Sequence, residues 1–278
     1  MGQALNAVDT LLEFPSRHPS TSGGVVGLVV LAYIANLVSL HIPLVGLLAG
    51  PILFGFGLAA MYGVINAEMD NELTNIIETA INTVNTSWIS VAGGVAFITA
   101  SLFTLIIGIG FVAAIVFMIV GLIGGAGLGI ATAGFLLLGG VAALFGAAMF
   151  LQFIIPAIVI EDKELMDAVN TALEIVKEQP VSVAGFTGIR MSLEYLPGLL
   201  LASVPLTILG SSLSENPEAV DSASQFAIAG GGTGLVITVF LVASVGVALG
   251  QFLRVAYTTA YFKQVREETV DDTIPAEA

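Results

Sequence analysis

Three charged residues inside otherwise apolar segments, Arg190, Glu194 and Arg254, are the part of this sequence best suited to chemistry. Arg190 and Glu194 are four residues apart, so a helix would place them on one face. Glu194 lies nine residues after Gly185 and Arg254 lies nine residues before Lys263, where the two apolar segments begin and end. At 1.5 Å per residue, each lies about 13 Å along its helix from the same end. Equal depth on antiparallel neighbours allows the three side chains to form one intramembrane cluster.

Two interpretations of this cluster stay open. Ionisable groups inside a membrane are costly and often mark functional sites, which would make the cluster a place for binding or transport. Alternatively, the two arginine side chains extend to the membrane surface and Glu194 is merely neutralised there.

No other motif predicts a reaction. The chain has no Cys, which excludes disulfides, thiolate metal sites and Cys nucleophiles. The only histidines are His18 and His41, so neither a histidine metal site nor a Ser–His pair has support. Gly125 and Gly127 do not continue into a dinucleotide-binding motif, because Ile130 stands where glycine or alanine is needed. We therefore expect a protein that is not an enzyme, with no catalytic residue, cofactor or metal ion.

The composition indicates that the bilayer is the solvent of this chain. Of 278 residues, 56% are hydrophobic and only 10% are charged, whereas soluble domains carry roughly 25% charged residues. This deficit argues against a water-soluble enzyme and against a disordered chain. The net charge of −14 would repel nucleic acid and anionic lipid headgroups. Such acidity is typical of halophilic proteins, so we expect a salt-loving source.

The distribution of charge predicts six membrane spans. No charged residue occurs between 23 and 66 or between 89 and 160, and a single span needs about 20 residues. We place spans near 23–41 and 44–66, two within 89–160, and one each at 185–209 and 227–262. Amphipathic helices are expected between them, at the N-terminus, at 67–88 and at 161–180.

The amphipathic segments also indicate an internal repeat. Residues 70–93 and 162–185 align without a gap and are identical at 10 of 24 positions, and the N-terminus holds a weaker copy. We interpret 1–278 as a single membrane domain of three pseudo-repeats, 1–66, 67–160 and 161–262, followed by an acidic C-terminal tail, 263–278. Equivalent amphipathic helices would lie on one side of the membrane. All seven Lys and Arg residues fall near that side, which predicts a multi-pass protein of the cell membrane with both termini cytoplasmic.

Small residues at four-residue steps predict close helix packing. They are Gly121, Gly125 and Gly129 in one segment and Gly246 and Gly250 in another. For residues 121–134, a turn between two spans is an equally good interpretation.

A second pattern concerns aromatic residues near the span ends, which we expect to lie in a belt at the membrane interface. These are Trp88, Tyr195, Tyr257, Tyr261 and Phe262.

The segments FIIPAIVIED at 153–162 and DAVNTALEIVKEQP at 167–180 carry a resemblance to known proteins. They resemble a family of six-helix integral membrane proteins that includes conserved haloarchaeal proteins. They are more distantly similar to the membrane domain of some bacterial glycerophosphodiester phosphodiesterases. The resemblance implies a six-helix membrane fold and supplies no catalytic residues. Because this chain has no counterpart of the soluble phosphodiesterase domain, we do not expect that activity.

The expected architecture is therefore an all-α, polytopic transmembrane helix bundle with six spans in three units of amphipathic helix plus helical hairpin. The expected function is non-enzymatic binding of partners or lipid at the cytoplasmic membrane. The alternative is a transporter or channel for a small solute or ion that uses the Arg190, Glu194 and Arg254 cluster. The bilayer is the expected partner, a protein partner or a second copy of the chain stays open, and no nucleic acid is expected.

Overall fold

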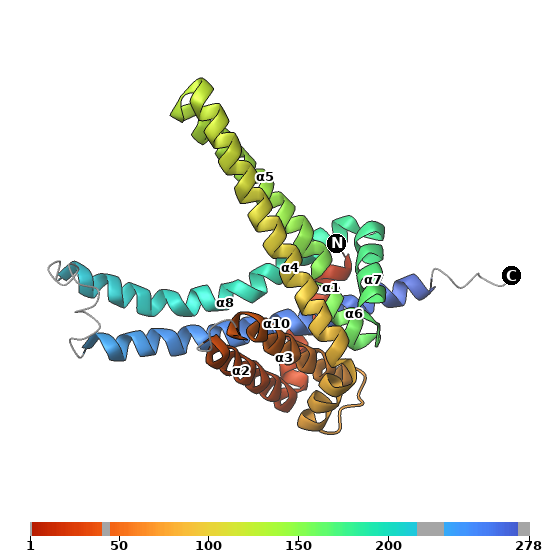
Figure 1. Cartoon of the computed structure of the whole chain (residues 1–278). Coiled ribbons are helices and arrows are strands. Elements are labelled where there is room, and N and C mark those ends of the chain that lie inside the picture. Colours follow the sequence, from red (N-terminus) through yellow and green to blue (C-terminus); the bar gives the residue numbers. More distant parts are fainter. Residues whose placement is uncertain (1, 41–44, 216–230, 272–278) are drawn as a thin grey trace.

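The computed structural model describes residues 2–40, 45–215 and 231–271, and within these ranges the chain is helical with short turns and no strand. Three hairpins dominate the arrangement (Figure 1). Their helices are α2 (Pro19–Leu40) with α3 (Val45–Met69), α4 (Ile76–Gly124) with α5 (Ala126–Leu151), and α8 (Pro180–Glu215) with α10 (Gly231–Asp271). Three shorter helices complete the chain, namely α1 (Gly2–Arg17), α6 (Ile154–Ile160) and α7 (Leu165–Glu178).

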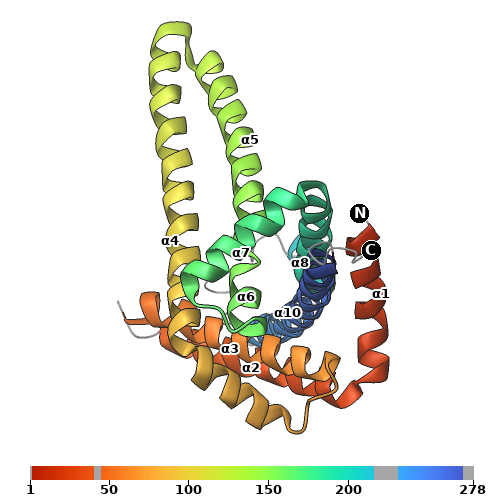
Figure 2. The same ribbon diagram turned by 90° about the vertical axis from the view of Figure 1, so that its right-hand side faces the viewer.

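The shorter helices gather at one end of the molecule. We call this region the base, and it consists of α1, α6, α7 and the last part of α10. The hairpins α4–α5 and α8–α10 project from the base in different directions, and α2–α3 packs against α10 and α4 (Figures 1 and 2). The hydrophobic core lies where the hairpins meet the base, and every described helix contributes to it, α5 through its last residue, Leu151.

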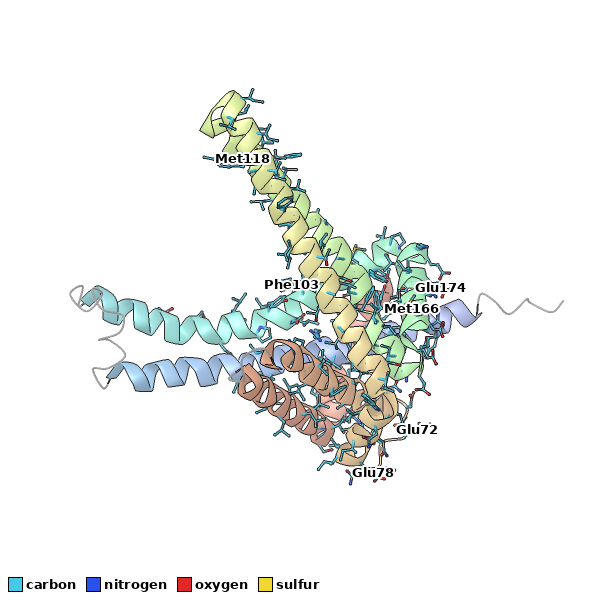
Figure 3. The ribbon with its side chains drawn as sticks, viewed as in Figure 1. Glu72, Glu78, Phe103, Met118, Met166 and Glu174 are labelled. Carbon is cyan, nitrogen blue, oxygen red and sulfur yellow. The ribbon has the colours of Figure 1, made fainter. Side chains whose placement is uncertain are left out.

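The hairpin α4–α5 has a surface that only hydrocarbon can cover. Large apolar side chains point outward along its whole length, as Phe103 and Met118 do in Figure 3. Leu122 near the tip is 82% exposed. Three apolar helical stretches among the described residues are long enough to cross a membrane, Gly50–Met69, Ile76–Gly124 and Gly127–Ile160. Soluble monomers rarely expose contiguous apolar patches of this extent. These features indicate a helical membrane protein.

The amphipathic helix expected at 67–88 is not a separate element, and that prediction is wrong. Helix α3 continues to Met69, a turn follows, and α4 begins at Ile76 and runs without a break to Gly124. Asn75 caps it, accepting hydrogen bonds from the backbone N–H groups of Ile77 at 2.9 Å and Glu78 at 3.2 Å.

Proline explains where α2 and α8 begin. Helix α2 begins at Pro19 and α8 begins at Pro180, the two positions that correspond in the sequence alignment. Proline lacks the N–H that a helix interior needs, so it is favoured in the first turn of a new helix. In the second unit Trp88 stands at this position. Nothing interrupts the hydrogen bonds there, so the amphipathic and apolar parts form one helix.

The aromatic residues near the end of α10 are core residues rather than members of an interfacial belt. Tyr257, Tyr261 and Phe262 are fully buried. Phe186 of α8 stacks on Tyr261 with ring centroids 4.1 Å apart, and the Tyr257 hydroxyl donates a hydrogen bond to the Ala4 carbonyl at 3.0 Å. The prediction is wrong for these three because α10 passes through the base, where other helices surround it. Trp88 and Tyr195 are exposed.

The glycines of 121–134 serve both as a turn and as a packing surface. Gly125 has a φ of +84° and separates α4 from α5, a conformation that glycine adopts without strain. Next to this turn, Gly129 faces Gly121 so closely that a Cβ on Gly129 would lie 3.1 Å from the Gly121 Cα. The two interpretations of this segment therefore apply to different residues within it.

Gly246 and Gly250 bring α10 against α8. A Cβ on Gly246 would lie 2.8 Å from the Gly198 Cα, and a Cβ on Gly250 would collide with the backbone carbonyl of Glu194. Small residues allow helices in lipid to approach closely. This contact fixes the two helices side by side at the level of Glu194.

The expected acidic tail at 263–278 is helical over its first part. Helix α10 continues to Asp271, and Val265 is buried in the base. Arg266 pairs with Glu161 at 2.5 Å, and Lys263 pairs with Asp70. The sequence pattern showed only that acidic residues predominate in this segment, whereas its basic residues pair with acidic residues in the turns after α3 and α6. Residues 272–278 lie outside the described part of the chain.

The close approach at Gly250 predicts a stability change. The substitution Gly250→Ala should cost about 1–3 kcal/mol, because the added methyl group forces the α8 and α10 backbones apart. A matched control is Gly188→Ala on α8, where a Cβ meets nothing within 4 Å. It should be neutral or stabilise the protein by up to about 1 kcal/mol through higher helix propensity. Thermal unfolding in detergent measures both, and equal effects would contradict the tight contact.

Candidate functional site

The structure brings Arg190, Glu194 and Arg254 together between α8 and α10. Arg190 Nη2 lies 2.8 Å from Glu194 Oε2, and Arg254 Nη1 lies 2.8 Å from Glu194 Oε1. The side chains are largely withdrawn from the surface, with exposed fractions of 14% for Arg190, 8% for Glu194 and 13% for Arg254. We call these three residues the triad. Their meeting depends on the glycine contact described above, because Gly250 packs on the backbone of Glu194.

Two glutamines extend the triad into a network that sequence reasoning did not include. Gln251 Nε2 donates to Glu194 Oε1 at 3.1 Å. Gln152, between α5 and α6, accepts from Arg190 Nη1 at 3.1 Å and donates to Thr187 Oγ1 at 2.7 Å. A signal for Gln152 exists, since it is the only amide side chain between residues 89 and 160. An isolated polar residue in so apolar a run needs a partner.

The triad carries one excess positive charge in an apolar surrounding. Both carboxylate oxygens of Glu194 accept hydrogen bonds, from the two arginines and Gln251. Each guanidinium has five N–H donors and stays protonated in proteins. Among the described residues, the buried Nε of Arg190 has no hydrogen-bond partner. Gln251 Oε1 is likewise buried without a partner, so the site contains one unpaired donor and one unpaired acceptor.

Two cavities open on either side of Glu194. The first has a volume of about 320 Å³ and lies among α3, α4, α5, α8 and α10, with all three triad residues in its wall. Most of its other lining is apolar, including Phe54, Leu58 and Leu102. The second has a volume of about 450 Å³ and is lined by Phe54, Glu194, Tyr195, Gly198, Leu199, Val247 and Gln251. Glu194 therefore lines both cavities, and each cavity combines at least one charged lining residue with apolar ones.

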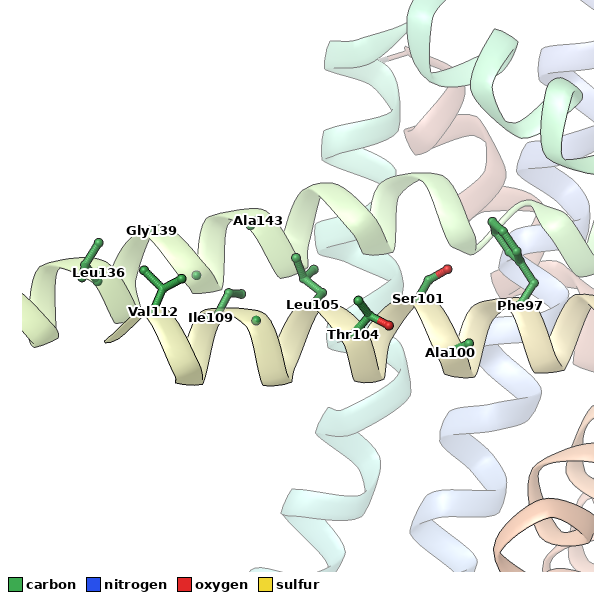
Figure 4. Close-up of a pocket in the computed structure, with 12 residues that line it drawn as sticks. Phe97, Ala100, Ser101, Thr104, Leu105, Ile109, Val112, Leu136, Gly139 and Ala143 are labelled. Carbon is green, nitrogen blue, oxygen red and sulfur yellow. The ribbon is translucent and has the colours of Figure 1, made fainter. Parts of the chain in front are cut away.

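A larger groove of about 800 Å³ lies between α4 and α5 and is almost wholly apolar (Figure 4). Ser101 and Thr104 are the only hydroxyl-bearing residues in its lining, among side chains such as Leu105, Ile109 and Leu136. Ordinary acyl chains of the bilayer can fill such a groove, and nothing in its lining would distinguish one ligand from another.

The acidic residues of the base have structural partners. Glu161 pairs with Lys163 at 2.7 Å and with Arg266 at 2.5 Å, and His18 pairs with Glu68. The Glu161–Arg266 pair connects the turn before α7 to α10, and the His18–Glu68 pair connects the junction of α1 and α2 to the end of α3. In the described part of the chain, no group of three or more His, Asp or Glu side chains is placed to hold a metal ion.

No protein family, curated protein or solved structure matches this chain. The site is therefore interpreted from its own geometry.

The triad predicts a specific pattern of stability changes. Glu194→Leu should destabilise the fold by about 3–5 kcal/mol, because it leaves two guanidinium groups buried without a counter-charge. The triple change Arg190→Met, Glu194→Leu and Arg254→Met should recover most of that loss, because no buried charge then remains. Thermal unfolding in detergent compares them. A single variant as stable as the natural chain would show that the arginines do not depend on Glu194.

Proposed function

We propose that this chain is a six-span integral membrane protein of the cell membrane that binds a lipid in the cavities beside the triad and catalyses no reaction. The observation that carries the proposal is the amphipathic character of these cavities. Arg190 and Arg254 meet Glu194 in the wall of the first cavity, and apolar side chains from α3, α4 and α5 form most of the remaining wall. A few convergent polar groups in an otherwise apolar pocket are typical of ligand sites.

The saturated carboxylate favours binding over proton transfer. Each oxygen of Glu194 is already held by an arginine. A general base needs a free oxygen near a substrate proton, and a general acid needs a proton to give. Glu194 has neither while the triad is intact. The arginines are suited to holding an anion or a carboxylate, which is the role they have here.

The six spans and the orientation of the chain are part of the proposal. The three hairpins supply six helices, and the sequence repeat suggests three units that enter the membrane from the same side. Equivalent proline positions at the start of α2 and α8 support the repeat. Arg17, Lys163, Lys263 and Arg266 lie in the base, which would therefore face the cytoplasm with both termini. The similarity of 153–180 to six-helix membrane proteins agrees with this count.

Cysteine labelling can test the topology, because the chain has no Cys of its own. We expect single cysteines at Glu72 and Glu174, both exposed in the base region, to react with a membrane-impermeant maleimide only after permeabilisation. A cysteine at Gly127, at the tip of α4–α5, should react in intact cells. Labelling of Glu72 and Glu174 from opposite sides would contradict three equivalent units.

Filling the first cavity should displace bound lipid. Leu102→Trp adds bulk to the α4 wall opposite the triad, so we expect at least a tenfold loss of lipid retained through purification, measured by native mass spectrometry. The control Leu122→Trp lies at the exposed tip of α4 and should leave retention unchanged. If both variants retain lipid like the natural chain, the cavity is not where lipid binds.

A transporter or channel is the second candidate function. It is favoured by the two cavities that meet at Glu194, because a solute passing between them would encounter the triad. Flux assays in proteoliposomes with a panel of ions and small solutes test it. Uptake that depends on Glu194 would favour transport, and its absence alongside retained lipid would favour binding.

A further inference from the structure

The charge of the cavity lining differs in sign from that of the whole chain. The chain carries −14, yet the charged residues in the wall of the first cavity, Arg190, Arg254 and Glu194, sum to +1. The exposed carboxylates of Glu13, Glu72, Glu174 and their neighbours are concentrated in the base and in the turn between α3 and α4. A ligand inside the membrane therefore meets a local positive field, and the low dielectric around it strengthens that field.

The triad also has hydrogen-bond capacity that the protein does not use. Arg190 donates through Nη1 to Gln152 and through Nη2 to Glu194, while its buried Nε has no partner among the described residues. Arg254 reaches Glu194 through Nη1. A buried donor without an acceptor is costly. An anion in the first cavity, whose wall contains both guanidinium groups, would supply the missing acceptor.

The apolar part of the site extends from the triad away from the base. Along α8, which starts at the base, Gly198 and Leu199 lie about one turn beyond Glu194. On the antiparallel α10, Val247 lies one turn beyond Gln251 in the same direction. Chains of a ligand whose polar group binds the triad would therefore run toward the hairpin tips, into the hydrocarbon.

We propose that the triad binds the phosphate group of an anionic phospholipid in the first cavity, with the acyl chains passing Phe54, which lines both cavities, toward Leu199 and Val247. This inference rests on the lipid-binding function proposed above and names the headgroup chemistry. The two guanidinium groups hold opposite oxygens of Glu194, so they approach from different directions. The tetrahedral oxygens of a phosphate can reach both, and arginine matches phosphate with paired hydrogen bonds. A zwitterionic lipid adds an ammonium group, which the excess positive charge repels.

Binding to the delipidated protein in detergent, measured by native mass spectrometry, tests the proposal. Four probes are compared: phosphatidylglycerol, phosphatidylcholine with the same acyl chains, the corresponding free fatty acid, and inorganic phosphate. We expect phosphatidylglycerol to bind at least tenfold more tightly than the other three, since one charge-assisted hydrogen bond is worth about that factor.

Substitutions that are expected to change phosphatidylglycerol affinity in opposite directions separate lipid recognition by the triad from a purely structural role of the triad. Arg254→Gln leaves Glu194 paired with Arg190 and should weaken phosphatidylglycerol binding about tenfold, and phosphatidylcholine binding by a smaller factor because its ammonium group offsets the charge of its phosphate. Glu194→Gln removes the internal competitor for the arginines and should tighten phosphatidylglycerol binding severalfold. The controls Arg17→Gln and Glu78→Gln change the net charge equally at exposed positions and should have no effect. If Arg254→Gln does not fold, Arg254→Lys can replace it, because lysine keeps the positive charge but lacks the paired N–H donors of the guanidinium group. It should weaken phosphatidylglycerol binding by less than Arg254→Gln would.

Each other outcome overturns a distinct part of this scheme. Equal affinity for the two phospholipids would leave lipid binding intact and remove the charge selectivity. Equally tight binding of the fatty acid would show that the triad recognises a carboxylate rather than a phosphate. Equally tight binding of inorganic phosphate would assign the site to a soluble anion. Failure of every lipid to bind would overturn the proposed function itself.

Discussion

The fold depends on one constraint, which is that hydrocarbon and not water must cover most of its helices. The side chains of α4 are exposed along almost its entire apolar length. Without water, every backbone N–H and C=O in this region has to be satisfied internally, which a helix achieves and a loop does not. The same constraint acts on charge. An ionised side chain placed at this depth needs a counter-charge and hydrogen bonds from the protein itself.

The triad meets this second requirement through backbone packing. Gly246 and Gly250 lack the side chains that would hold α10 away from α8, so Glu194 and Arg254 lie within hydrogen-bonding distance. A buried ion pair is weak evidence for stability, because apolar residues of similar size often fold as well. The anionic ligand proposed above would account for the unequal number of positive and negative charges in the triad. The excess charge and the unused donor of Arg190 are the features that stability alone does not require.

Much of this arrangement follows from the sequence, and the exceptions have physical causes. Runs without charge predict where the apolar helices lie, and equal distances from the span ends predict that Glu194 can meet Arg254. Periodicity reports only the polarity of a helix face, so it did not show that Tyr257 and Tyr261 pass through a protein core rather than along an interface. Gln152 joins the site through a contact 38 residues distant in the chain, which no local pattern encodes.

The repeat gives this site an asymmetry that bears on its origin. At the constant offset of 92, Arg190 and Glu194 of the third unit correspond to Ile98 and Leu102 of the second. All four line the same cavity, two from α8 and two from α4. If the units share an ancestor, equivalent positions now form the charged wall and the apolar wall of one pocket. The difference at Trp88 and Pro180 coincides with a difference in the helices, because α4 continues through position 88 whereas α8 begins at Pro180. Under the proposed repeat, divergence of the copies would produce an amphipathic cavity that three identical units would not.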